Sequence, residues 1–345
     1  MATTVTLLHW NIYQFSNNKV NNANGAALIN YIAEVVSQAS PDIISILEIK
    51  NGAVNNIVSR LIPAINLKNK EGPPALNKWR SISINSQKNH EAYVVLYRID
   101  KGFLPLAPGI GGGTDPINAL SNQTLLPNGN PGGQLRFNSS LTTNGGRKPY
   151  YVVFRTGDGK NFSIVAYHTM FGIHSPIGVR NVGELAQSRA IIDNGATVNM
   201  QASMICGDFN VDFDPLNPGP YDKLLTSVPS IQSTNAKTSL VNFTPPGGYP
   251  TSPEYRKNAY DNIFRYVRAG KPTTVTGRVV DLINESTKPP VGTGFMAPEA
   301  GAFIPGPILD GNLIQNIPPQ DFEDAWHIVR HAISDHLPVY VSLTF

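Results

Sequence analysis

A strand–helix–strand pattern near the N-terminus limits the possible folds of this chain more than any other feature. Residues 5–12 and 42–48 are short apolar segments, and residues 26–39 between them carry apolar side chains at helical spacing. This order predicts a right-handed crossover between two parallel strands. The sequence therefore predicts an α/β fold built on a buried, partly parallel sheet.

Both of these apolar segments end in a polar residue. Asn11 closes the first segment and Glu48 closes the second. Sites in α/β sheets lie at the carboxyl ends of the parallel strands, where such residues meet. A buried carboxylate without a partner is also costly, so Glu48 is expected to bind a partner there, as a ligand of a metal ion. The two side chains are predicted to share one functional site.

Two later motifs add carboxylates, an amide and an imidazole. One apolar run ends in Gly-Asp-Phe-Asn, which places Asp208 and Asn210 two residues apart and on the same side of a strand. Asp335 and His336 stand together where a final strand begins. Oxygen atoms of Asp and Asn suit a hard cation such as Mg²⁺, and a neighbouring histidine can transfer a proton. Together these motifs indicate metal-assisted cleavage of a phosphate ester.

Three further segments place ionisable residues at strand ends. One predicted strand ends in His168, another begins with Glu91, and a third segment contains Asp261. With these motifs in this order, the chain resembles the endonuclease/exonuclease/phosphatase superfamily, and most closely its deoxyribonuclease I-like branch. The resemblance implies a four-layered α/β sandwich, in which two packed mixed β-sheets are flanked by helices.

The resemblance also implies a site with two acid–imidazole pairs facing one phosphate. Glu91 would orient His168, and Asp261 would orient His336, in the way that a carboxylate fixes the tautomer of a catalytic histidine. His336 would act as the general base and His168 as the general acid, although the two histidines could exchange these roles. Asp208 and Asn210 would orient the attacking water or hold phosphate oxygens; both are therefore counted among the catalytic residues.

The expected cofactor is a divalent cation, Mg²⁺ in the first place, with Mn²⁺ or Ca²⁺ as alternatives. Glu48 would be its main ligand, with help from Asn11 and Asp335. The cation would offset the negative charge that develops on the phosphate.

DNA is the expected substrate, held by basic residues. Lys50 matches a position that deoxyribonuclease I-like enzymes use against the phosphate backbone. Arg136, Arg147 and Lys148 lie in a segment, residues 101–148, that is rich in glycine and is interpreted as a long loop insertion. Together with Asn210, these four residues form the predicted substrate-binding set.

The sequence leaves two other functions open. Tyr13 and Asn89 stand where deoxyribonuclease I-like enzymes place an arginine and a tyrosine that contact DNA. Asn-Ile-Tyr at residues 11–13 resembles the sphingomyelinase branch instead, and the apolar Phe295 and Phe303 could touch a lipid surface. A phospholipid phosphodiesterase is therefore the main alternative, and an inactive binding module of the same fold is the other.

Composition sets further limits. The formal net charge is +3 and charged residues make up 15% of the chain, which is too mild for an obligate nucleic-acid-binding protein. Cys206 is the single cysteine, so no intrachain disulfide can form, and its apolar strand predicts an inert core thiol. No stretch is apolar for long enough to insert stably in a membrane, and no signal peptide is visible. We expect a monomer that is cytoplasmic or secreted.

One domain is expected over residues 1–345, with insertions at about 101–148 and 284–320, and no stable partner chain. Three further elements are expected, namely helices over residues 52–62 and 180–198 and a β-hairpin over residues 151–167.

Overall fold

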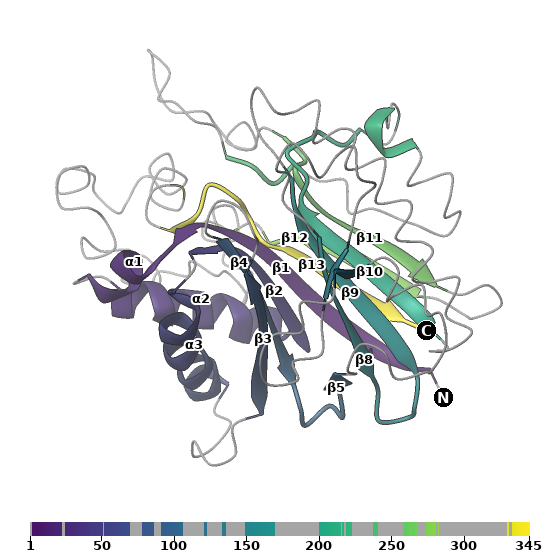
Figure 1. Cartoon of the computed structure of the whole chain (residues 1–345), viewed down its shortest axis with the longest axis horizontal. Helices are drawn as coiled ribbons and strands as arrows, with labels where there is room; N and C mark the ends of the chain where they lie inside the picture. Colours follow the sequence, from purple (N-terminus) through teal and green to yellow (C-terminus); the bar gives the residue numbers. More distant parts are fainter. Residues whose placement is uncertain are drawn as a thin grey trace, which may run out of the picture.

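The computed structural model describes residues 2–22, 25–50, 52–69, 78–85, 91–105, 121–122, 133–135, 149–169, 200–214, 216, 219–222, 237–240, 258–267, 274–280, 282, 330 and 333–345. Within them, two mixed β-sheets pack face to face, and helices cover the outer side of the first sheet (Figure 1). The predicted α/β sandwich is confirmed. The helix expected over residues 180–198 lies outside the described residues.

The first sheet has the strand order β12-β13-β1-β2-β4-β3. The bounds are β1 Thr4–Phe15, β2 Ile43–Lys50, β3 Trp79–Asn85, β4 Glu91–Arg98, β12 Thr274–Val279 and β13 Val339–Thr344. The strands β1 and β2 are parallel, as the strand–helix–strand pattern predicts, and the other neighbours are antiparallel. Thr4 pairs with Thr344, so the two termini lie side by side at one end of this sheet (Figure 1).

The second sheet has the order β11-β10-β9-β8-β7-β6, with β5 paired to β8. The bounds are β5 Leu104–Pro105, β6 Ser121–Asn122, β7 Gly133–Leu135, β8 Tyr150–Arg155, β9 Asn161–His168, β10 Met200–Asp208 and β11 Asp261–Val267. Parallel pairing joins β9 and β10, while β8 and β9 form the predicted hairpin. Three strands of this sheet fall in residues 101–148. The sequence interpretation of that segment as a long loop or irregular insertion does not indicate these strands, because strands of two or three residues are too short to show an alternating pattern.

The helices are α1 Asn17–Asn21, α2 Gly25–Ala39 and α3 Val54–Lys68, with a 3₁₀ turn, η4, at Gly219–Tyr221. The helix predicted for residues 26–39 is confirmed. The helix predicted for residues 52–62 continues instead through Pro63 to Lys68. Leu61 and Ile65 on this helix are fully buried, and their packing offsets the hydrogen bond that the proline removes. None of the helices in the described ranges is long and apolar enough to cross a bilayer.

The alternation of side chains along β1 separates two hydrophobic cores. Leu8 and Trp10 belong to the core between the first sheet and the helices. Val5 and Leu7 belong to the core between the two sheets, and Cys206 lies buried there as predicted. Residues two apart share a face of a strand, so the positions that continue the inter-sheet face of β1 are His9 and Asn11. The fold thus points both of these polar side chains between the sheets.

Gly207, just before the Gly-Asp-Phe-Asn aspartate, allows β10 to pack closely on β9. A Cβ atom at Gly207 would lie 1.9 Å from the backbone oxygen of Tyr167. The backbone cannot move away as a flexible side chain could, so we expect Gly207→Ala to lower the free energy of unfolding by about 3 kcal/mol. Urea denaturation measures this loss.

The matched control for this prediction is Gly159→Ala in the β8–β9 turn. Gly159 has φ +82°, but a Cβ there would meet nothing within 4 Å. Only backbone strain opposes the change, with a cost of about 1 kcal/mol. Equal losses in the two variants would contradict the close approach of β9 and β10.

Candidate active site

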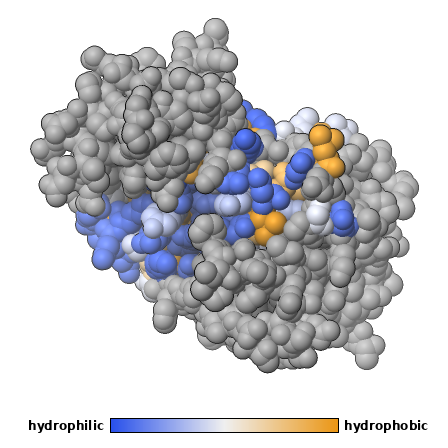
Figure 2. Space-filling view, turned by 90° about the horizontal axis from the view of Figure 1, so that it is seen from above, coloured by the Kyte–Doolittle hydropathy of each residue, from blue (hydrophilic) through white to orange (hydrophobic). Residues whose placement is uncertain are grey.

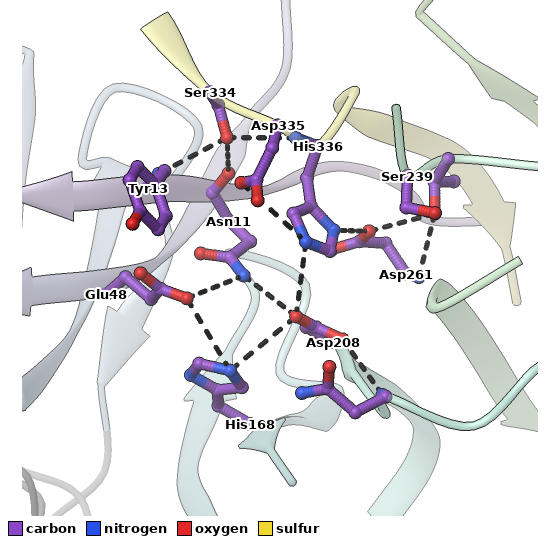
Figure 3. A network of polar contacts seen from close by, with 12 residues as sticks. Asn11, Tyr13, Glu48, His168, Asp208, Ser239, Asp261, Ser334, Asp335 and His336 are labelled. Atoms are coloured by element: carbon purple, nitrogen blue, oxygen red, sulfur yellow. Dashed lines mark hydrogen bonds and ion pairs between the residues drawn. The ribbon is translucent and has the colours of Figure 1, made fainter. Parts of the chain in front are cut away.

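The candidate site lies at the end of the strands away from the termini, where the two sheets meet. Asn11 and Glu48 lie toward the carboxyl ends of β1 and β2 in the first sheet. His168 and Asp208 end the parallel strands β9 and β10 in the second. The side chains converge on one another (Figure 3).

Asn11 links carboxylates from the two sheets. Its amide nitrogen donates to Glu48 Oε1 at 3.3 Å and to Asp208 Oδ2 at 2.9 Å. Its carbonyl oxygen Oδ1 is buried and has no hydrogen-bond partner among the described residues. Oδ1 is therefore an acceptor that the described residues leave unused.

Glu48 is held in an uncommon backbone conformation. Its φ of 60° lies in the left-handed region, which is uncommon for a non-glycine residue and recurs at functional sites. Burial raises the pKa of Glu48, but attraction to His168, the hydrogen bond from the Gln14 backbone and attraction to His336 outweigh that effect. Its pKa is thus below the ordinary value, and the side chain is a carboxylate at neutral pH.

Two imidazoles flank the carboxylate of Asp208. The Nε2 atoms of His168 and His336 each lie 3.6 Å from Asp208 Oδ2. His168 Nε2 is also 3.7 Å from Glu48 Oε1. His168, His336 and Asp208 are buried and Glu48 is nearly so, which strengthens the electrostatic interactions among these four side chains.

The first acid–imidazole pair joins the sheets through His168. Its Nδ1 lies 3.2 Å from Glu91 Oε2, and both side chains are buried. Lys50 Nζ lies 3.7 Å from Glu91 Oε1. Lys50, predicted as a substrate-binding residue, thus contacts the carboxylate that orients His168.

The second pair joins His336 to Asp261. His336 Nδ1 hydrogen-bonds to Asp261 Oδ2, and Thr238 Oγ1 donates to the same oxygen at 2.8 Å. Burial lowers the pKa of His336, but the charges of Asp261 and Asp208 and the hydrogen bond to Asp261 raise it well above its ordinary value. Asp261 therefore both orients this imidazole and favours its protonated form.

A hydroxyl group holds the segment that carries His336 against β1. Ser334 Oγ donates to the Asn11 carbonyl at 2.5 Å and accepts from the backbone nitrogens of Tyr13 and His336 at 3.2 and 3.1 Å. The Trp10 indole nitrogen donates to the His336 carbonyl at 3.0 Å. The bonds of Ser334, which are drawn in Figure 3, and the bond of Trp10 together fix the position of His336 relative to Asn11.

Lys19, in the short helix α1, makes a second link between the same two segments. Its Nζ donates to the carbonyls of Tyr13 and Ile333, each at 2.7 Å. Burial lowers the pKa of Lys19 to about 8, against the opposing attraction of Asp335 and Glu48. The lysine thus adds positive charge close to the carboxylates of the site.

Sequence reasoning missed four residues of this assembly: His9, Lys19, Thr238 and Ser334. No sequence motif assigns His9 to the site, yet its Nε2 lies 3.9 Å from Asp261 Oδ1, and burial lowers its pKa to about 3. The signal that could have found it is its spacing, because His9 and Asn11 share one face of β1. Lys19 and Thr238 carry no comparable local signal.

Other predicted site residues lie at the margin or outside the described part. Asp335 Oδ1 is 3.8 Å from His336 Nε2, and the described groups that could hold a metal do not include it. The side-chain nitrogen Nδ2 of Asn210 donates to the Thr169 carbonyl at 3.2 Å. Arg136, Arg147 and Lys148 lie outside the described residues, as do Phe295 and Phe303.

Comparison with known proteins decides the family. Residues 8–267 match the sequence model of the Endonuclease/Exonuclease/phosphatase family. The chain belongs to this family. Curated protein sequences gave no match to this family member.

Solved structures share the endonuclease/exonuclease/phosphatase fold at low sequence identity. An endonuclease/exonuclease/phosphatase family protein from Bacteroides thetaiotaomicron superposes with a TM-score of 0.55 at 16% identity, over 100% of this chain and 96% of that one. The mannosyl-6-phosphatase of the same organism gives 0.52 at 16%, covering 99% and 100%. The human Nocturnin catalytic domain with bound sulfate gives 0.51 at 13%, covering 99% and 96%.

Members of the endonuclease/exonuclease/phosphatase family depend on divalent metals, and the donor atoms of this site fit such an ion. Ligand atoms of Glu48, His168 and Asp208 lie within 4.8 Å of one another, and so do those of Asp208, Asp261 and His336. Asn11, whose amide nitrogen contacts Glu48 and Asp208 of the first cluster, also carries an unpartnered neutral oxygen, Oδ1. Carboxylate and amide oxygens are the ligands that Mg²⁺ and Mn²⁺ prefer.

Proposed function

We propose that this protein is a metal-dependent phosphodiesterase whose substrate is DNA. The observation that carries the proposal is the placement of two carboxylate-oriented imidazoles on the same oxygen of Asp208, each at 3.6 Å. Hydrolysis of a phosphodiester needs one group to take a proton and another to give one, and this geometry supplies both.

The side chains divide the reaction as follows. His168, oriented by Glu91, takes a proton from the attacking water as its oxygen bonds to phosphorus. His336, whose pKa Asp261 and Asp208 raise above its ordinary value despite burial, carries a proton and gives it to the leaving oxygen as the old P–O bond breaks. This is the exchange of roles that the family resemblance leaves open. Asp208, which lies between the two imidazoles, orients the water. Each proton-transfer group is expected to contribute roughly 10²- to 10⁴-fold to the rate.

The charge of the site explains the need for a cation. A phosphodiester is itself an anion. Five carboxylates lie in or beside the site, namely Glu48, Glu91, Asp208, Asp261 and Asp335. A bound Mg²⁺ or Mn²⁺ would offset this repulsion and the charge that develops on the phosphate. Glu48 and Asn11 would hold the cation.

The choice of DNA rests on the motifs that the chain shares with the deoxyribonuclease I-like branch. Glu91 at the start of β4 hydrogen-bonds to His168, and Asp261 at the start of β11 hydrogen-bonds to His336. The face seen in Figure 2 is largely hydrophilic where its residues are described, with a few hydrophobic side chains among them.

A parallel assay with four substrates tests the proposal. Purified protein with Mg²⁺ is offered supercoiled plasmid DNA, RNA, sphingomyelin vesicles and mannose 6-phosphate. We expect plasmid cleavage, abolished by EDTA and restored by added Mg²⁺. Faster turnover of sphingomyelin or of the sugar phosphate would overturn the nuclease assignment, and no turnover of any substrate would favour a binding module.

The basic residues of the 101–148 segment give a second test of DNA as substrate. We expect the triple variant Arg136→Ala, Arg147→Ala and Lys148→Ala to bind DNA more weakly. Each lost phosphate contact should lower the slope of log affinity against log salt by about 0.9. Fluorescence anisotropy with a labelled duplex at several salt concentrations measures this slope.

The control for this prediction is the pair Phe295→Ser and Phe303→Ser in the apolar segment. These changes remove no charge and should leave the salt dependence unaltered. Two results together would point to a phospholipid substrate. The basic triple variant would cleave DNA at the wild-type rate, and the phenylalanine variants would lose vesicle binding.

A further inference from the structure

His9 lies in the inter-sheet layer directly below the site. It is fully buried in the middle of β1, where its backbone pairs with Val339 on one side and Ser45 on the other. Its side chain follows that of Asn11 on the same face of the strand. His9 therefore faces the second sheet, from which Asp261 projects.

Each ring nitrogen of His9 faces one polar atom. Nδ1 lies 3.4 Å from the hydroxyl oxygen of Ser45, and Nε2 lies 3.9 Å from Oδ1 of Asp261. The Ser45 hydroxyl can rotate to donate or to accept. The carboxylate oxygen can only accept, so the atom that faces it must carry a proton for the contact to be favourable.

Asp261 has one satisfied oxygen and one unsatisfied oxygen. Oδ2 accepts from Thr238 and bonds to His336. Oδ1 is buried and has no hydrogen-bond partner within the described ranges, and the same holds for His9 Nε2. Two orphaned buried groups that face each other at 3.9 Å are each costly unless they pair.

We propose that His9 is a positioning residue. Its Nε2–H donates to Asp261 Oδ1 and thereby fixes the carboxylate that orients His336. Each oxygen of Asp261 is then bonded to one imidazole, Oδ1 to His9 and Oδ2 to His336. Rotation of the carboxylate away from His336 would then break the bond to His9 as well. The kinetic consequence rests on the proposed phosphodiesterase function, but the hydrogen bond itself does not.

The hydrogen bond is tested in the substrate-free protein. ¹⁵N-histidine-labelled wild-type protein is measured by long-range ¹H–¹⁵N correlation, with the His9 signals assigned from their loss in His9→Gln. We expect a proton on Nε2 of His9. An unprotonated Nε2 would overturn the proposal, whatever the substrate assay shows, because this measurement needs no turnover.

The positioning role is tested by three substitutions that differ in reach. The amide of Gln can donate from about the position of the histidine Nε2, whereas the shorter Asn reaches only the position of Nδ1, and Phe keeps the ring volume without a donor. We expect His9→Phe and His9→Asn to lower kcat about 10- to 100-fold with little change in KM. His9→Gln should keep kcat within about threefold.

A role in packing alone predicts a different order. In that case Phe, which preserves the buried volume, would retain activity and Gln would not. Full kcat in His9→Phe, or no rescue by Gln relative to Asn, would contradict the proposal. If His9→Phe does not fold, the comparison of Gln with Asn decides the question.

Discussion

Glu48→Gln is expected to lower kcat on the order of 100-fold or more while the fold is retained. Gln has the same shape as Glu and can still accept the hydrogen bond from the Gln14 backbone. It removes the negative charge that a divalent cation requires at the centre of the site. Steady-state cleavage of plasmid DNA measures the loss, and circular dichroism reports the fold.

Glu34→Gln is the matched control for Glu48→Gln. Glu34 lies on α2, where it pairs with Lys68 at 2.8 Å, and takes no part in the site. This variant should keep full activity. Near-normal turnover by Glu48→Gln, under conditions where Glu34→Gln is also active, would mean that Glu48 does not hold a catalytic metal.

The second large effect concerns Asp261 and His336, which are expected to act as one unit. His336→Ala should lower kcat roughly 10²- to 10⁴-fold, because it removes a proton-transfer group. Asp261→Asn keeps the side-chain shape but loses the charge that stabilises the protonated imidazole. The double variant should be little slower than His336→Ala alone, since residues that work together are not additive.

The pair Glu91 and His168 offers the same cycle on the other side of Asp208. Glu91→Gln with His168→Ala should likewise be little worse than His168→Ala. Losses that multiply in both cycles would show that the carboxylates act independently of the imidazoles. A non-additive result for only one pair would confine the orienting role to that histidine.

Much of the site could be predicted because its residues lie at strand ends with a clear local pattern. Asn11, Glu48 and Asp208 each follow an apolar run, and the carboxyl ends of parallel strands must converge. The pairing of Glu91 with His168 came instead from the resemblance to a family. No pattern in the sequence itself brings the start of β4 to the end of β9.

The remaining features depend on contacts between distant segments. His9 looks like a core residue in sequence, and only the packing of β11 against β1 places Asp261 beside it. Lys19 was missed because its partners are backbone carbonyls, which no side-chain pattern reveals. The continuation of α3 through Pro63 likewise depends on the buried surface beneath the helix, which outweighs the local preference of proline.

The rate of plasmid cleavage by EDTA-stripped protein, measured as Mg²⁺ is added back, tests the central claim most directly. Five carboxylates lie in or beside the site at which an anionic phosphodiester would bind, so the stripped wild-type protein should be inactive. Its rate should rise with Mg²⁺ to saturation, whereas Glu48→Gln should need far more Mg²⁺ and reach a lower maximum. Plasmid cleavage at full rate in EDTA would contradict a metal-dependent phosphodiesterase.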